Sequence, residues 1–305
     1  MRRLTTGLLH GALGLLLGCG AVAHAQCPPP AWPPADLQRL KANQWKLTDD
    51  TQRQAVALAL VPCLGHADPA LRDGVAFEGL SALLRSKQLS AVTQRAIYQS
   101  QLAQLSPTAS DTHGFAKPFA ALVLSEVARA DRLVPFLSND ERAALVTAGA
   151  EYLTSIKDYR GFATGEGWRH AVAHAADLML QLALNPAIDA VQLQAMLLAV
   201  QSQIAPPGEH FYIYGEADRL TRPVLYAARR GLLDAGFWTG YIGTLAAPAP
   251  LKTWDDAFAS QAGLARMHNT KAFLRALDAG VRASSDAAVQ AALGTALPLA
   301  LKALP

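Results

Sequence analysis

Apolar residues recur along this chain at intervals of three and four, as Leu193, Met196, Leu197 and Val200 illustrate. This spacing gathers them on one face of an α-helix, whereas the two-residue alternation of half-buried strands is hard to find over any length. Ala and Leu supply most of the 51% hydrophobic fraction, and aromatic residues make up only 7%. Such a composition is typical of packed helices. The chain is therefore expected to fold as an all-α protein.

Residues that start and stop helices separate these apolar windows. Short oxygen-bearing side chains that can cap a helix N-terminus stand at Asp49, Asp68, Ser90, Ser138 and Asp189. Residues that end helices stand at Gly65, Gly231, Gly280 and the Asn185-Pro186 pair. The connections are mostly short, which predicts antiparallel neighbours that stack as αα-hairpins. A HEAT-like solenoid and an α/α-toroid-like array both fit this pattern, because no fixed repeat period distinguishes them.

The N-terminus has the three parts of a secretory signal peptide, which we place at residues 1–25. Arg2 and Arg3 form a positive start, residues 7–18 are apolar, and Ala23-His24-Ala25 fits a small-x-small cleavage site. A periplasmic or secreted protein is therefore expected. The stretch Leu16-Leu17-Gly18-Cys19 also resembles a lipoprotein box, so lipid anchoring through Cys19 is the alternative. A Pro-rich arm, residues 26–36, and a single all-helical domain, residues 37–305, are expected to follow.

Charge and hydropathy exclude several classes of partner. Removal of residues 1–25 takes away two arginines and no acidic residue, which leaves 25 basic and 24 acidic residues. This balance argues against a nucleic-acid partner and against a polybasic membrane anchor. No later segment has the 18 or more consecutive apolar residues typical of a transmembrane helix. No nucleotide-binding motif is present either, so the cofactor is left unknown. For an exported chain, the expected partner is an envelope protein, peptide or glycan.

Two cysteines, Cys27 and Cys63, lie beyond the signal peptide. An exported protein meets an oxidising compartment, where such a pair can form a disulfide. The bridge would pin the Pro-rich arm onto the first helices. Two unpaired thiols are the alternative, because spacing alone does not show that the side chains meet.

Residues 158–177 combine a Gly-punctuated loop with a helix that presents His170, His174 and Asp177 at positions i, i+4 and i+7. These three side chains can ligate a transition metal, with a further ligand from Glu166, Glu216 or Asp218, or serve as acid, base and orienting group. Ala171 occupies the position of the catalytic glutamate in the zincin motif, which excludes that class of metalloprotease. The alternative is that both histidines pack between helices while Asp177 pairs with an arginine.

A second polar cluster contains Glu216, Asp218 and Arg219. Glu216 and Arg219 stand three residues apart, which predicts an ordinary ion pair on a helix surface. If both residues instead lie deep between helices, the pair would orient the loop after Arg160. His113, in a third polar stretch, is expected to be a cap or loop residue, although it could face the same cavity as His174.

At these residues the chain resembles the bacterial domain of unknown function 2785. The resemblance covers roughly residues 37–230 and depends on Arg160-Gly-Phe, on Gly167-Trp168-x-His170-x3-His174-x2-Asp177 and on Glu216-x-Asp218-Arg219-Leu220. It implies an all-helical fold and singles out the same polar residues, but it implies no substrate, because the family has no established activity. The chain departs from the expected pattern at residues 113–118, so any role for that turn is in doubt.

Two functions remain open at this point. The first is a binding or structural module of the cell envelope, in which a buried polar network is formed by Arg160, Trp168, His170, His174, Asp177 and Arg219. The second is an envelope hydrolase or lyase, with His170 or His174 as general base and Asp177 as its orienting partner. Paired carboxylates of the glycosidase kind, Glu166 with Asp177 or with Glu216, are the alternative catalytic groups. In that enzyme Arg160 or Arg219 would clamp an anion and Trp168 would stack on a sugar.

Overall fold

The computed structural model describes residues 26–305, so the expected signal peptide and Cys19 lie outside the described residues. The expected all-α class is confirmed, since the described chain is mostly helical and has one two-stranded sheet. Its elements are α1 (Pro34–Ala42), α2 (Asp50–Leu60), η1 (Val61–Gly65), α3 (Pro69–Leu71), η2 (Arg72–Phe77), α4 (Glu78–Arg85), α5 (Ala91–Gln104), α6 (Ala116–Leu133), α7 (Asn139–Ser155), β1 (Phe162–Ala163), β2 (Gly167–Trp168), α8 (Ala171–Ala183), α9 (Ala190–Ser202), α10 (Glu216–Arg229), α11 (Ala235–Ala246), η3 (Asp255–Ala259), α12 (Gln261–Arg282), α13 (Ala287–Leu293) and α14 (Ala296–Ala303).

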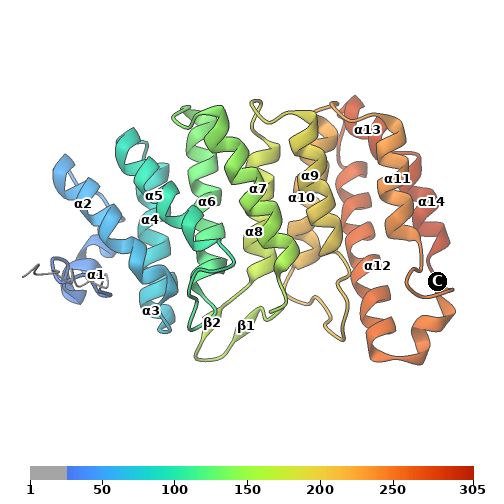
Figure 1. Cartoon of the computed structure of the whole chain (residues 1–305), viewed down its shortest axis with the longest axis horizontal. Helices are drawn as coiled ribbons and strands as arrows, with labels where there is room; N and C mark the ends of the chain where they lie inside the picture. Colours follow the sequence, from blue (N-terminus) through green and yellow to red (C-terminus); the bar gives the residue numbers. More distant parts are fainter. Residues whose placement is uncertain (1–25) are drawn as a thin grey trace, which may run out of the picture.

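The helices lie side by side, largely in chain order, along the long axis of the molecule (Figure 1). The first helices lie at one end, α12 to α14 lie at the other, and the β1–β2 hairpin extends from one edge in the middle. In the central part, α8 packs against α6 on one side and against α10 on the other. Five alanines of α8 are buried, which lets these neighbouring backbones approach closely: Ala171, Ala173, Ala175, Ala176 and Ala183.

Most helix starts and stops occur where the sequence predicts them. The five expected N-cap side chains each accept a hydrogen bond from a backbone amide of the following turn: Asp49, Asp68, Ser90, Ser138 and Asp189. The expected stop at Gly280 is wrong, because α12 continues to Arg282. A Cβ at this position would collide with Leu225 of α10, so the glycine serves the packing of two helices.

A single large hydrophobic cluster extends from Leu37 to Ala300, and a small second one surrounds Trp254. No helix among residues 26–305 is long and apolar enough to cross a membrane.

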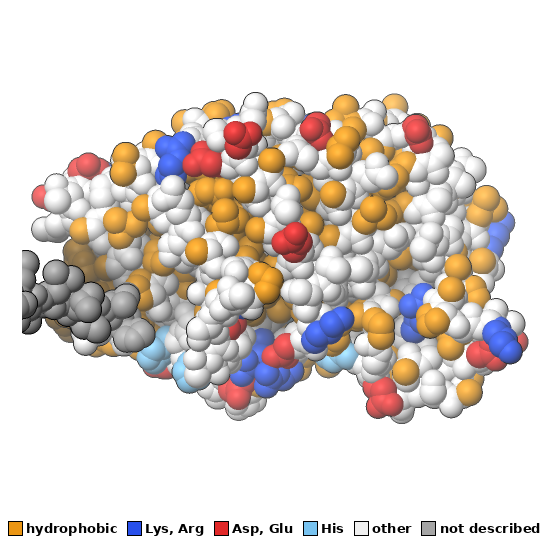
Figure 2. Space-filling model, viewed as in Figure 1, with side chains coloured by type: hydrophobic (Ala, Val, Ile, Leu, Met, Phe, Trp, Pro, Cys, Tyr) orange, Lys and Arg blue, Asp and Glu red, His pale blue; other side chains and the backbone are white. Residues whose placement is uncertain are grey.

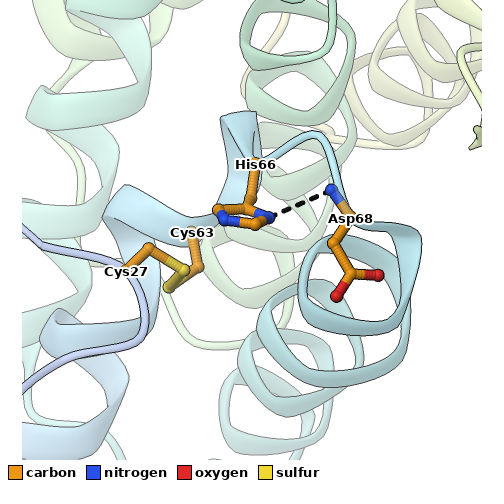
Figure 3. Close-up of a disulfide and its surroundings, with 4 residues drawn as sticks. All are labelled: Cys27, Cys63, His66 and Asp68. Carbon is orange, nitrogen blue, oxygen red and sulfur yellow. Dashed lines mark hydrogen bonds between the residues drawn. A yellow bond between two sulfur atoms is a disulfide. The ribbon is translucent and has the colours of Figure 1, made fainter.

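The predicted disulfide between Cys27 and Cys63 is present and joins the Pro-rich arm to η1 (Figure 3). The two Cα atoms lie 5.2 Å apart. Beside the bridge, the backbone amide of Asp68 donates to His66 Nδ1 over 3.0 Å, which shapes the turn into α3. The disulfide thus holds the arm against the start of the array.

Removal of this disulfide is expected to lower the free energy of unfolding by about 2–4 kcal/mol, because it closes a long loop in the unfolded chain. The two cysteines are 36 residues apart. Urea unfolding of the oxidised protein with and without dithiothreitol would measure the loss. A Cys27→Ser/Cys63→Ser variant should already have the lower stability and should not respond to the reductant. Equal stability of the oxidised and reduced wild type would contradict the prediction.

Candidate functional site

The loop between α7 and α8 folds into a hairpin in which β1 pairs with β2 in antiparallel register. Gly165 and Gly167 have φ values of 85° and 76°, the left-handed region that glycine adopts without strain. Gly161 lies directly against the ring of Tyr214, which precedes α10. The glycines that punctuate this segment are therefore required by the turn and by a close approach to a neighbouring loop.

Two buried arginines fasten the hairpin to the N-terminal part of the array. The guanidinium of Arg72 donates to the backbone carbonyl of Glu166 over 2.6 Å and to the carbonyls of His66 and Ala67. Its carbon Cζ lies 3.7 Å from the ring centroid of Phe115. Arg169 lies over the same ring at 4.1 Å and donates to the side chain of Glu166. The tip of the hairpin is thereby fixed on η2 and α6.

His170 is the N-cap of α8 and is not part of its first turn, because the helix begins at Ala171. The three side chains of His170, His174 and Asp177 therefore do not form the single helical stripe that was expected, because only the last two lie on the helix. The backbone amides of Arg169 and His170 donate to the carbonyls of Gly161 and Arg160, so the hairpin determines the direction in which the chain enters the helix. His170 has φ 50° and ψ 37°. A non-glycine residue held in this region stores backbone strain, and such residues cluster at functional sites.

The imidazole of His170 lies between an indole and a carboxylate. It stacks on Trp168 with ring centroids 4.8 Å apart, and its Nε2 lies 3.8 Å from Glu216 Oε1. Among residues 26–305 neither of these two atoms has a hydrogen-bond partner, although both are buried. The other carboxylate oxygen, Glu216 Oε2, accepts a hydrogen bond from the amide of Tyr214. Glu216, rather than Asp177, is thus the carboxylate beside His170.

The predicted surface ion pair between Glu216 and Arg219 is wrong. Glu216 is buried and faces His170, and Arg219 instead pairs with Asp177 of α8. A partner on the adjacent helix displaces the local one because α8 and α10 pack closely. Burial raises the pKa of Asp177, while the charge of Arg219 opposes this shift.

His174 is buried one turn into α8, with its ring edge-to-face against Phe119 at 5.2 Å and 5.8 Å from the ring of His170. Its Nδ1 has no hydrogen-bond partner within residues 26–305. Burial lowers the pKa of His174 to about 3, and the nearby His170 and Arg219 add to the shift. Burial and the charge of Arg219 lower the pKa of His170 to about 4. Both imidazoles are neutral at pH 7.

These side chains line a cavity of about 620 Å³ between α4, α6, α8 and α10. Its charged members are Arg85, Glu126, Asp177, Arg219 and Arg222, and its other members are Phe77, Leu122, Ser125, Trp168, His170, His174, Leu180, Gln181 and Tyr214. Glu126 is held by two hydrogen bonds from Arg85. The volume falls within the range of small-molecule sites, about 300–1,000 Å³, although most of the lining side chains are polar or charged.

The sequence-predicted residues thus divide into two groups. Lining the cavity are Trp168, His170, His174, Asp177 and Arg219, with Glu216 behind His170. Outside the cavity lie Arg160, Glu166, Asp218 and His113: Arg160 pairs with Asp158, Glu166 pairs with Arg169, and the other two side chains are exposed. Along residues 26–305, no group of three or more His, Cys, Asp and Glu side chains is arranged to hold a metal ion.

Sequence reasoning missed three charged cavity residues, namely Arg85, Glu126 and Arg222. Arg222 follows Arg219 by three residues, so helical spacing could have placed both on one face of α10. No local pattern signals Arg85 and Glu126, because they come from two other helices.

Comparison with known proteins adds a family and no activity. No curated protein and no solved structure matches the chain. Residues 102–278, more than half of the chain, match the family described as "Protein of unknown function (DUF2785)". The match begins later and ends later than the resemblance noted in the sequence, and it contains the hairpin, both histidines and the start of α10. The chain belongs to the DUF2785 family.

Proposed function

We propose that this chain is an exported binding protein of the cell envelope, periplasmic or secreted, that takes a small polar ligand into the cavity between α6, α8 and α10. The scaffold in this proposal is an open array of stacked αα-hairpins. The observation that carries the proposal is the buried Nδ1 of His174, which lines the cavity without a hydrogen-bond partner in the described chain. The disulfide between Cys27 and Cys63 supports export, because such bonds persist in oxidising compartments.

A purely structural polar network is the main competitor, and the hydrogen bonds of the site weigh against it. In such a network every buried polar atom is satisfied, because an unsatisfied one costs about 1–3 kcal/mol. Here His170 Nε2, His174 Nδ1 and Glu216 Oε1 are all buried without partners in residues 26–305. Buried atoms without partners also occur away from the cavity in the described chain, as at Gln203 and Tyr241. What distinguishes these three is their position at or directly behind a cavity of ligand size.

Substitution of His174 by Leu is therefore expected to raise the free energy of unfolding by about 1 kcal/mol, because it removes an unsatisfied buried polar group while conserving volume. Urea unfolding at pH 7.5 would measure the change. His113→Leu, at an exposed loop residue, is the control and should change stability by less than about 0.5 kcal/mol. A clear loss of stability in His174→Leu would favour the structural network.

Ligand binding itself can be tested by the thermal shift of the mature chain against a panel of sugars, sugar acids, polyols and amino acids. A compound that stabilises the wild type, but neither His174→Leu nor Trp168→Ala, would support the proposal. A compound that stabilises all three proteins equally would bind elsewhere. Failure of the whole panel, together with a destabilised His174→Leu, would overturn the proposal.

A second candidate is a hydrolase or lyase that acts on an envelope glycan or peptide in the same cavity. It is favoured by the strained backbone of His170 and by the carboxylate of Glu216 at 3.8 Å from its imidazole. In this candidate Glu216 orients His170, the role first expected for Asp177. Release of new reducing ends or amino groups from cell-wall fragments, lost in Glu216→Gln, would test it.

A further inference from the structure

The charges of the cavity indicate which ligand it accepts. On the basis of the proposed function, we infer that the occupant is an acidic sugar: a hydroxylated ring that carries a carboxylate. Three features of the lining support this chemistry, namely one guanidinium without a partner, one buried nitrogen that can accept a hydrogen bond, and an aromatic wall.

The lining has three arginines and two carboxylates, so with neutral imidazoles it has one surplus positive charge. Arg85 is engaged by Glu126, and Arg219 is engaged by Asp177. Arg222 is exposed and its charge acts on the pKa of Asp177, but it forms no hydrogen bond or ion pair with any residue between 26 and 305. A guanidinium recognises a carboxylate through two parallel hydrogen bonds, so Arg222 is the group that a ligand carboxylate would engage.

His174 indicates a hydroxyl on the same ligand. The side chain is 7% exposed, and its Nδ1 lacks a partner along the described residues. A neutral imidazole has one nitrogen that donates and one that accepts. When Nε2 carries the proton, Nδ1 can accept a hydrogen bond from a ligand hydroxyl. An apolar molecule that carries a carboxylate but no hydroxyl group would leave this nitrogen unsatisfied.

The aromatic side chains of the cavity wall indicate that the ligand contains a ring. Trp168 and Tyr214 line the cavity with their rings perpendicular and 5.9 Å apart. Trp168 is 39% exposed, although it is a large apolar side chain. An aromatic side chain of this kind combines an apolar face with a polar tip, and the apolar face of a pyranose can pack against it. An inorganic anion would satisfy Arg222 but would leave both the wall and most of the cavity unused.

The test is isothermal titration of the mature chain at low ionic strength with D-glucuronate and with D-glucose, which differ at one carbon. We expect glucuronate to bind at least about tenfold more tightly, because glucose lacks the charged group that Arg222 binds. Arg222→Gln should remove this preference. Arg229→Gln, on the same helix and paired with Asp286, should preserve it. Inorganic phosphate should compete only weakly with glucuronate.

Three results would overturn the inference. Equal affinity for glucose and glucuronate would leave the cavity as a ligand site but exclude an acidic ligand. Unchanged glucuronate binding in Arg222→Gln would place the anion elsewhere. Absence of binding by either sugar would reject an acidic sugar of this size, and the stability of His174→Leu would then decide separately whether the cavity is a ligand site at all.

Discussion

Acidification from pH 6.5 to pH 4.5 is expected to destabilise the folded chain by up to about 1.4 kcal/mol per pH unit for each of His170 and His174. Their pKa values in the folded protein are lowered to about 4 and about 3, against about 6.5 in an unfolded chain. Between these values the unfolded state binds protons that the folded state does not. The stability is therefore fully present above about pH 6.5 and is lost as the pH falls toward the folded pKa values.

Urea unfolding at pH 7.5, 6.5, 5.5 and 4.5 would measure this dependence, and a His170→Gln/His174→Gln variant is the comparison. Carboxylates with lowered pKa values, such as the buried Asp131 and the partly exposed Asp158, lose their contribution only below about pH 4, so they do not affect the stability in this pH range. The pKa of His210 is also lowered by burial, and its contribution should persist in the double variant. Identical pH slopes for the two proteins would show that neither imidazole is buried in its neutral form.

Helices were predictable here because the signals that specify them are local. Apolar spacing identifies the buried face, and a single oxygen such as that of Ser138 or Asp189 satisfies the free amides at a helix start. Gly280 shows the limit of such signals. The residue that ends a helix in isolation is retained inside α12, because Leu225 of another helix requires the space.

Only those residues of the candidate site that lie close together in the sequence could be predicted to lie close together in the fold. His174 and Asp177 share a cavity, as helical spacing within α8 allows, and Trp168 of β2 lines the same cavity. The choice of ionic partners did not follow from spacing, since Arg219 pairs across helices with Asp177. The left-handed backbone of His170 was equally hidden, because it occurs where the hairpin passes into α8, and that hairpin is held by a distant arginine, Arg72.

Substitution of Arg72 is expected to have a large effect on stability. Arg72→Met should lower the free energy of unfolding by about 3–5 kcal/mol, as expected when one member of a buried ion pair is removed. Arg72 is 0% exposed and lies beside Asp73, with which it pairs at 2.7 Å. Its loss would leave Asp73 unpaired and remove the donor to the carbonyl of Glu166. Methionine retains much of the apolar bulk, so the loss measures the charge and its hydrogen bonds.

Arg160→Met is the matched control, because Arg160 lies in the hairpin loop that Arg72 holds and also pairs with an aspartate, Asp158, but is exposed. Exposed ion pairs contribute at most about 1 kcal/mol, so this variant should unfold close to the wild type. Loosening of the hairpin in Arg72→Met should also shift the fluorescence of Trp168, measured as the difference from the same variant that carries Trp168→Phe. If Arg72→Met were as stable as Arg160→Met, the hairpin would be held by its own backbone pairing, and Arg72 would not fix the position of Trp168 and His170 at the cavity.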